Sequence, residues 1–174
     1  IYGVSFDLIG KQPIVLLKTA DGNRYLPIWI GHPEAAAILM KLQGAEAPRP
    51  LTHDLLVNIL GELDVDVVRV TVTELRENTF HASITVAQNG AEVEVDSRSS
   101  DAIAVAVRAQ APIFAADEVI DESSIEMEGD EINEEEVVDE FRRFLDKVSA
   151  EDFAEAEVEV EPEDEDDEGE GGVG

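Results

Sequence analysis

Three acidic residues each stand in the first turn of a predicted helix: Glu34, Asp54 and Asp101. Carboxylates that lie together bind Mg²⁺ or Mn²⁺, hard cations that take oxygen ligands and keep waters and substrate phosphates around them. Arg49 and Arg98 precede two of these helix starts. A guanidinium beside unpaired helix N–H groups is suited to bind phosphate. The residue types therefore indicate metal-assisted hydrolysis of a phosphodiester bond.

A histidine, His53, directly precedes one of the three carboxylates. Histidine changes charge near neutral pH, so this side chain is the candidate for orienting or deprotonating the attacking water. The site residues predicted on this hypothesis are His53, Asp54 and Asp101 for catalysis, Glu34, Asp54 and Asp101 for the metal, and Arg49 and Arg98 for the substrate phosphate.

The same residues also have an ordinary structural explanation. Acidic side chains in the first turn of a helix meet backbone N–H groups and the positive end of the helix dipole, which is worth about 0.3–1 kcal/mol each. Thr52 and Ser99 or Ser100 are typical N-caps, and the arginines can pair with the neighbouring aspartates to fix the loops. Both explanations stay open from the sequence.

Other side chains of functional types receive less weight. Trp29, within "LPIWIG", is expected in the core rather than as a platform for stacking bases, and His81 is expected on the polar face of a strand. His32, before Pro33, fits an N-cap position as easily as a metal ligand. The chain contains no cysteine, which excludes thiolate zinc sites and cysteine nucleophiles.

Alternation of apolar and polar residues, together with turn residues, predicts the elements that must carry the site. Strands are expected at 1–9, 13–19, 24–30, 65–75, 78–88 and 91–96, and helices at about 33–43, 53–63 and 100–110. The segment "APIFAADEVI" after the third helix is expected to form a short strand or a loop. This pattern predicts an α+β fold with antiparallel or mixed sheet segments and packed helices. Twice along the chain, predicted strands are followed by a helix start that contains an arginine, a hydroxyl residue and an aspartate. The domain is therefore expected to contain two loosely related halves.

The acidity of the chain lies mainly in its C-terminal third. The net charge is −29, of which residues 1–116 carry −5 (9 Lys and Arg, 14 Asp and Glu) and 117–174 carry −24 (3 against 27). A capping box at Asn133 and Glu136 predicts an amphipathic helix, and the sequence from about 155 cannot bury apolar surface. The predicted organisation is a domain over 1–130, an amphipathic helix over 131–150 and a disordered acidic tail over 151–174.

The composition also bears on location. No apolar run approaches the roughly 20 residues of a membrane helix, and the first residues do not resemble a secretion signal. The lack of cysteine is compatible with a reducing compartment. We therefore expect a cytoplasmic protein that has no membrane partner.

Several motifs occur in a fixed order along residues 1–130: "LPIWIG" with Glu34 shortly after, "RPLTHDLL", "NTF" before a strand, "DSRSSDAIAVAV" and "APIF". Together they resemble the bifunctional nuclease domain family. The resemblance implies an α+β domain, self-association into a homo-oligomer, and the activity on DNA and RNA reported for some members. The positions that match are Glu34, Arg49, His53, Asp54, Arg98 and Asp101. The family usually has proline where this chain has Ser99 and an aromatic residue where it has His81.

The leading hypothesis is a nuclease that uses Mg²⁺ or Mn²⁺ to hydrolyse phosphodiester bonds in DNA or RNA. The alternative is a non-catalytic homo-oligomeric regulator or scaffold, favoured by the predicted amphipathic helix and by how much of the motif helix capping explains. A third hypothesis is that the acidic tail mimics nucleic acid and covers the basic site. The catalytic hypothesis requires that folding bring the three carboxylates to one pocket.

Overall fold

The computed structural model describes residues 1–7, 11–22, 24–45 and 47–126. All described residues belong to one compact unit. The amphipathic helix predicted over 131–150 and the acidic tail predicted over 151–174 lie outside the described residues.

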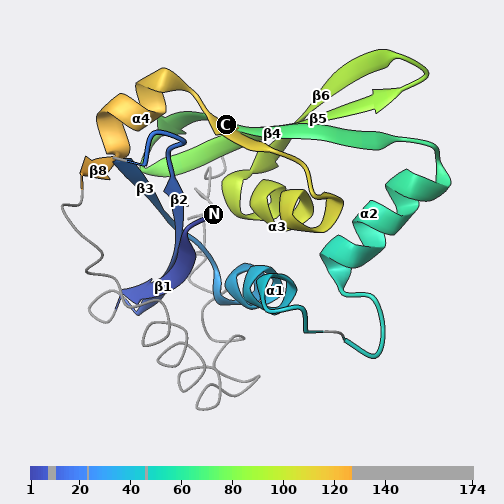
Figure 1. The fold of residues 1–174 in the computed structure, drawn as a ribbon, viewed down its shortest axis with the longest axis horizontal. Helices are drawn as coiled ribbons and strands as arrows, with labels where there is room; N and C mark the ends of the chain where they lie inside the picture. Colours follow the sequence, from blue (N-terminus) through green and yellow to red (C-terminus); the bar gives the residue numbers. More distant parts are fainter. Residues whose placement is uncertain (8–10, 23, 46, 127–174) are drawn as a thin grey trace, which may run out of the picture. The chain divides into compact units, whose positions relative to one another are not determined.

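The first sheet contains the N-terminal strands (Figure 1). Its members, in spatial order, are β1 (Gly3–Asp7), β2 (Gln12–Lys18), β3 (Arg24–Trp29) and β8 (Ile125–Glu126), all paired antiparallel. Val15, Leu26 and Ile28 are fully buried on these strands. Trp29 is 50% exposed, so the expectation that it belongs to the core was wrong. It ends β3, directly after the buried Ile28, where the alternation of the strand turns its ring away from the core.

The second sheet has the spatial order β6-β5-β4-β7. Its members are β4 (Asp66–Arg76), β5 (Thr79–Gln88), β6 (Ala91–Arg98) and β7 (Ile113–Ala115). The first three pair antiparallel, whereas β7 runs parallel to β4. Asn89 and Gly90 connect β5 to β6 with φ values of 51° and 81°, as the tight Asn-Gly hairpin turn requires. The predicted α+β fold with antiparallel and mixed sheet segments is confirmed.

Helices follow the strands. They are α1 (His32–Leu42), α2 (Thr52–Glu62), α3 (Ser99–Ala109) and α4 (Asp117–Ser123). The predicted strand or loop at "APIFAADEVI" was only half right, because α4 begins inside it and buries Val119 and Ile120. The predicted N-caps were also wrong. Leu51 and Arg98 occupy the cap positions of α2 and α3, and Thr52 and Ser99 are the first residues of these helices.

Helix α3 is the centre of the described domain. In Figure 1 it lies between the second sheet and α1, with α2 beside one end. Ala102, Ile103, Ala104, Val105 and Ala106 are all buried, and five consecutive buried residues mean that the helix is covered on every side. One side packs on Val70, Ala82 and Ile84 of the sheet. Side chains at the two ends of α3 are therefore held in place by a rigid element.

Both halves of the domain use the same order of elements. Strands β1, β2 and β3 lead into α1, and strands β4, β5 and β6 lead into α3. This order agrees with the two loosely related halves expected from the sequence. None of the described helices has the length and apolar character needed to cross a membrane.

The central position of α3 predicts how two apolar substitutions differ. Ile103 is 0% exposed, whereas Leu63, after α2, is 58% exposed. We expect Ile103→Ala to lower the free energy of unfolding by about 2–5 kcal/mol, because it leaves a cavity in a closed core. Leu63→Ala is the control and should cost less than about 1 kcal/mol. Urea unfolding followed by circular dichroism measures both, and equal losses would contradict the central role of α3.

Candidate active site

Glu34 lies in the first turn of α1, whose N-cap residue is Gly31. A Cβ atom added to Gly31 would lie 2.2 Å from Oε2 of Glu34. Glycine at this position therefore leaves room for the carboxylate to fold back over the start of the helix. The Glu34 side chain is only 15% exposed, so its carboxylate is held close to the domain surface.

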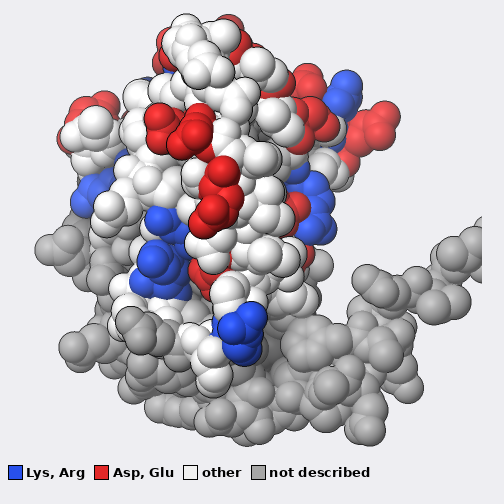
Figure 2. Space-filling model, turned by 90° about the vertical axis from the view of Figure 1, so that its right-hand side faces the viewer, with Lys and Arg blue, Asp and Glu red and all other residues white. Residues whose placement is uncertain are grey.

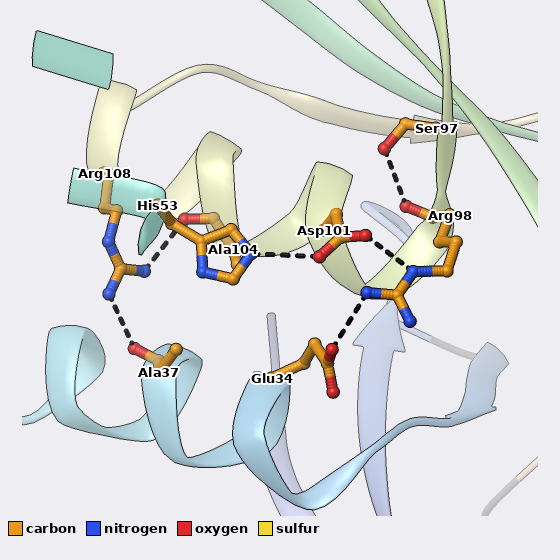
Figure 3. A network of polar contacts seen from close by, with 8 residues as sticks. All are labelled: Glu34, Ala37, His53, Ser97, Arg98, Asp101, Ala104 and Arg108. Carbon is orange, nitrogen blue, oxygen red and sulfur yellow. Dashed lines mark hydrogen bonds and ion pairs between the residues drawn. The ribbon is translucent and has the colours of Figure 1, made fainter. Parts of the chain in front are cut away.

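Arg98 links two of the three predicted carboxylates (Figure 3). Its Nε donates to Oδ2 of Asp101 at 2.7 Å, and its Nη2 donates to Oε1 of Glu34 at 2.9 Å. Arg98 ends β6 and caps α3, Asp101 lies in the first turn of α3, and Glu34 comes from α1. One guanidinium thus brings together carboxylates from two different helices.

His53 contacts the same network from α2. Its Nε2 lies 3.0 Å from Oδ1 of Asp101, and its side chain is 13% exposed. Burial opposes the ionisation of Asp101, but hydrogen bonds from Arg98 and His53, and their charges, hold its pKa below the ordinary value of 3.8. An ionised carboxylate only accepts hydrogen bonds, so Nε2 must carry the proton. In the neutral imidazole the lone pair is then on Nδ1, which points away from Asp101.

Asp54, the third predicted carboxylate, belongs to a second network. Its Oδ2 accepts a hydrogen bond from the backbone N–H of Leu51 at 2.9 Å, and its Oδ1 accepts from Nε of Arg108 at 2.6 Å. Burial again opposes ionisation, but these two donors and the charges of Arg108 and Lys41 hold the pKa of Asp54 below 3.8. None of the contacts among the described residues connects Asp54 to the other two predicted carboxylates.

Arg108, which the sequence analysis missed, is the anchor of this second network. Its side chain is 4% exposed. Besides Asp54 at the start of α2, its guanidinium donates to the carbonyl oxygen of Ala104 in α3 at 3.0 Å and to that of Ala37 in α1 at 3.1 Å (Figure 3). The sequence spacing could have identified Arg108, because Asp101, Ala104 and Arg108 are at i, i+3 and i+7 and therefore fall on one face of a helix. This single side chain joins three helices.

Arg49, the second predicted phosphate ligand, lies apart from Arg98. It lines a pocket of about 280 Å³ together with Lys41, Asp54 and Arg108. The ion pairs found among the described residues include neither Lys41 nor Arg49. On the face shown in Figure 2, the basic side chains form separate small groups with acidic ones between them. On this face an anion would therefore contact separate basic groups rather than a continuous basic surface.

The chemistry of the network bears on whether it can hold a metal ion. Within the part of the chain that the structure describes, no group of three or more His, Cys, Asp or Glu side chains is placed to hold one. Mg²⁺, however, commonly takes only one or two protein carboxylates and completes its shell with waters and substrate phosphates. Glu34 and Asp101, which already share the positive charge of Arg98, fit that requirement.

The chain is similar in sequence to a protein family and to several individual proteins. Residues 15–128 match the family described as the bifunctional nuclease domain. Uncharacterized proteins from two strains of Mycobacterium tuberculosis are 39% identical over 160 residues, which covers 88% of this chain and 95% of each relative. Bifunctional nuclease 1 of Oryza sativa subsp. japonica is 28% identical over 103 residues, which covers 57% of this chain and 31% of that protein.

The second network predicts a pH-dependent contribution to stability. Asp54→Asn should lower the free energy of unfolding at pH 7, because a neutral amide replaces the anion that Arg108 and the Leu51 N–H bind. The folded-state pKa of Asp54 is lowered. Its contribution is therefore fully present above the unfolded-state pKa and is lost as the pH falls through the folded-state pKa. Urea unfolding is followed from pH 7 down to about pH 3. The stability difference between the two proteins should be constant near neutral pH and should shrink as the pH falls below the unfolded-state pKa of about 3.9.

The matched control for this titration is Glu92→Gln, which removes a carboxylate paired with Arg69 at the surface, where Glu92 is 51% exposed. Its effect should be small at every pH, because surface ion pairs contribute little. If the stability difference between wild type and Asp54→Asn stays constant over the whole range, the ionised form of Asp54 does not have the assigned role.

Proposed function

The chain belongs to the bifunctional nuclease domain family, and we propose that it is a metal-dependent nuclease that hydrolyses phosphodiester bonds in nucleic acid. The observation that carries the proposal is one network in which Arg98 binds both Glu34 and Asp101, and Asp101 also contacts His53. These groups come from three helices and supply two carboxylates, an imidazole and a phosphate-binding cation. Capping of the helices does not require them to meet.

Glu34 and Asp101 would hold Mg²⁺ or Mn²⁺, which when bound acts as a Lewis acid on the phosphate and lowers the pKa of water. A cation and the guanidinium of Arg98 compete for the same carboxylate oxygens. The side chain of Arg98 is 67% exposed, so it can turn to a substrate phosphate without any loss of buried packing. There it pairs with the phosphate oxygens and stabilises the charge that develops on them.

His53 is the proposed general base. Asp101 binds its Nε2, which leaves Nδ1 to take the proton from the attacking water. Asp101 keeps its hydrogen bond to Nε2 when the imidazolium forms. The ring is nearly buried, which restricts it to few orientations. Its position on α2 is fixed by the neighbouring contact between Asp54 and Arg108.

Arg49 is proposed to bind a second phosphate of the same strand. Together with Lys41 it lines a pocket that shares no lining residue with the one next to Arg98. Two separated phosphate contacts favour a nucleic acid strand over a mononucleotide, since phosphate contacts fix the register of a strand on a protein. The proposal keeps Asp54 out of the metal shell, because its partner Arg108 is 4% exposed and also donates to carbonyl oxygens of α1 and α3, whereas the partner of Asp101 is 67% exposed.

A second candidate function is a non-catalytic homo-oligomeric scaffold, and helix α2 favours it. Every residue of α2 is described and none is buried. Three of its large apolar side chains, Leu55, Leu56 and Ile59, are 53%, 41% and 46% exposed. A row of exposed apolar side chains on one helix suits contact with another protein surface, for which a second copy of the chain is the simplest candidate.

A cleavage assay tests the proposed nuclease. The purified full chain with Mn²⁺ should cut labelled single-stranded DNA or RNA, and removal of the metal by EDTA should stop the reaction. Asp101→Asn and His53→Ala should each lower the rate at least about 100-fold, because they remove the carboxylate that holds the base and the base itself. The substitution Glu92→Gln, on the exposed surface of β6, should leave the rate unchanged.

Two outcomes would contradict the proposal. One is cleavage that persists at the same rate in Asp101→Asn, since a contaminating nuclease or a different site would then be responsible. The other is the absence of cleavage of either nucleic acid with Mg²⁺ and with Mn²⁺, combined with an oligomer in sedimentation analysis. That combination would favour the scaffold.

A further inference from the structure

We propose that the pocket beside Arg98 is a nucleobase-binding subsite that accepts an unpaired base of the substrate strand, an inference that rests on the proposed nuclease function. The pocket has a volume of about 380 Å³. Its lining residues include the aromatic Trp29 and Phe80 and the amide-bearing Asn78 and Gln12. Rings that stack on a base and amides that bind its edge are the groups that proteins use to hold a single nucleobase.

Trp29 is the main reason for this assignment. The residue is 50% exposed and lines this pocket, so an aromatic surface is available to a planar ligand. The ring stands two residues before Gly31, at the end of β3. It is therefore next to the segment that places Glu34 in the candidate active site. A base that stacks on this ring would lie close to the reacting phosphate.

The polar part of the lining comes from a different element. The turn between β4 and β5 places Glu77 and Asn78 at φ values of 50° and 58°, the left-handed conformation of a tight hairpin turn. This turn brings Asn78 and Thr79 to the pocket, which Trp29 at the end of β3 also lines. A side-chain amide both donates and accepts hydrogen bonds, as the edge of every nucleobase does.

Arg98 connects the subsite to the candidate active site. It lines the pocket and also binds Glu34 and Asp101. A nucleotide within a strand supplies both groups that such a site would bind: a phosphate for the guanidinium and a planar base for Trp29. A base inside a duplex is paired and stacked on both sides, so it would have to be extruded at a cost of a few kcal/mol. The substrate class is therefore single-stranded or locally unpaired nucleic acid.

Trp29 itself reports on this proposal, because it is the one tryptophan of the chain. The full chain, in EDTA to prevent cleavage, is titrated with a short single-stranded DNA oligonucleotide while tryptophan fluorescence is followed. We expect saturable quenching, since a stacked base contacts the indole directly. An oligonucleotide of the same length with abasic sites keeps the phosphates and should not quench, and the duplex form should quench about tenfold more weakly.

Variants test the subsite independently of the fluorescence signal. By anisotropy of a labelled oligonucleotide, Trp29→Ala should weaken binding about 10–100-fold, whereas Trp29→Phe should retain most of the affinity because it keeps an aromatic ring. The control is Phe114→Ala, which removes another exposed aromatic ring, 53% exposed on β7, outside this pocket. Equal binding of the abasic and normal oligonucleotides, or equal losses in Trp29→Ala and Phe114→Ala, would overturn the proposal.

Different results would refute the proposed subsite and the proposed nuclease function. Base-dependent quenching by a chain that cuts no nucleic acid with Mn²⁺ would support the subsite and refute the proposed nuclease. Metal-dependent cleavage at equal rates by wild type and Trp29→Ala, on both single strands and duplexes, would support the nuclease and refute the subsite.

Discussion

The buried guanidinium of Arg108 is the interaction on which the arrangement of this domain depends. A buried charge is costly unless it is paired and hydrogen-bonded, and this one is satisfied by a carboxylate of α2 and by carbonyl oxygens of α1 and α3. The three helices that Arg108 joins also contain His53, Glu34 and Asp101. The arrangement of the candidate active site thus depends on a contact that the proposed mechanism does not use.

Two aspartates of the same local type pair with arginines that differ in exposure. Asp54 and Asp101 both lie in the first turn of a helix and both have a lowered pKa. The partner of Asp54 is 4% exposed, whereas the partner of Asp101 is 67% exposed. An exposed guanidinium can be exchanged for a substrate or a cation, but a buried one cannot leave without breaking the packing of the helices. In the proposed mechanism, the exposure of the arginine therefore distinguishes the pair assigned to the chemistry from the pair assigned to the packing.

Local patterns in the sequence were sufficient for most of the fold. Alternation over β4 and β5 and the turn at Asn89 and Gly90 predicted a hairpin, because both depend on neighbouring residues alone. The short helix α4 was missed, since a helix of about two turns carries too little periodicity to separate it from a loop. Trp29 was misplaced because an aromatic residue in an apolar stretch usually belongs to the core. Its exposure results from its place at the end of a strand.

The contacts within the candidate site could be predicted only in part from local sequence patterns. Convergence of Glu34 and Asp101 was inferred from their similar positions at helix starts, and the contact through Arg98 agrees with that inference. Asp54 was grouped with them because it also lies in the first turn of a helix. This position contains no information on which helices pack against each other. The partner of Asp54 is 54 residues away in the sequence, and a pairing over such a distance is decided by the packing of α2 on α3.

The measurement that most directly tests the account is the single-turnover cleavage rate of the Asp54→Asn variant under conditions in which circular dichroism shows it to be folded. The asparagine oxygen can still accept a hydrogen bond from Arg108, so the account predicts a rate within about tenfold of the wild type. A folded Asp54→Asn protein that has lost cleavage as completely as a protein lacking the Asp101 carboxylate would contradict it. Asp54 would then belong to the reactive group, and the division between the two networks would be wrong.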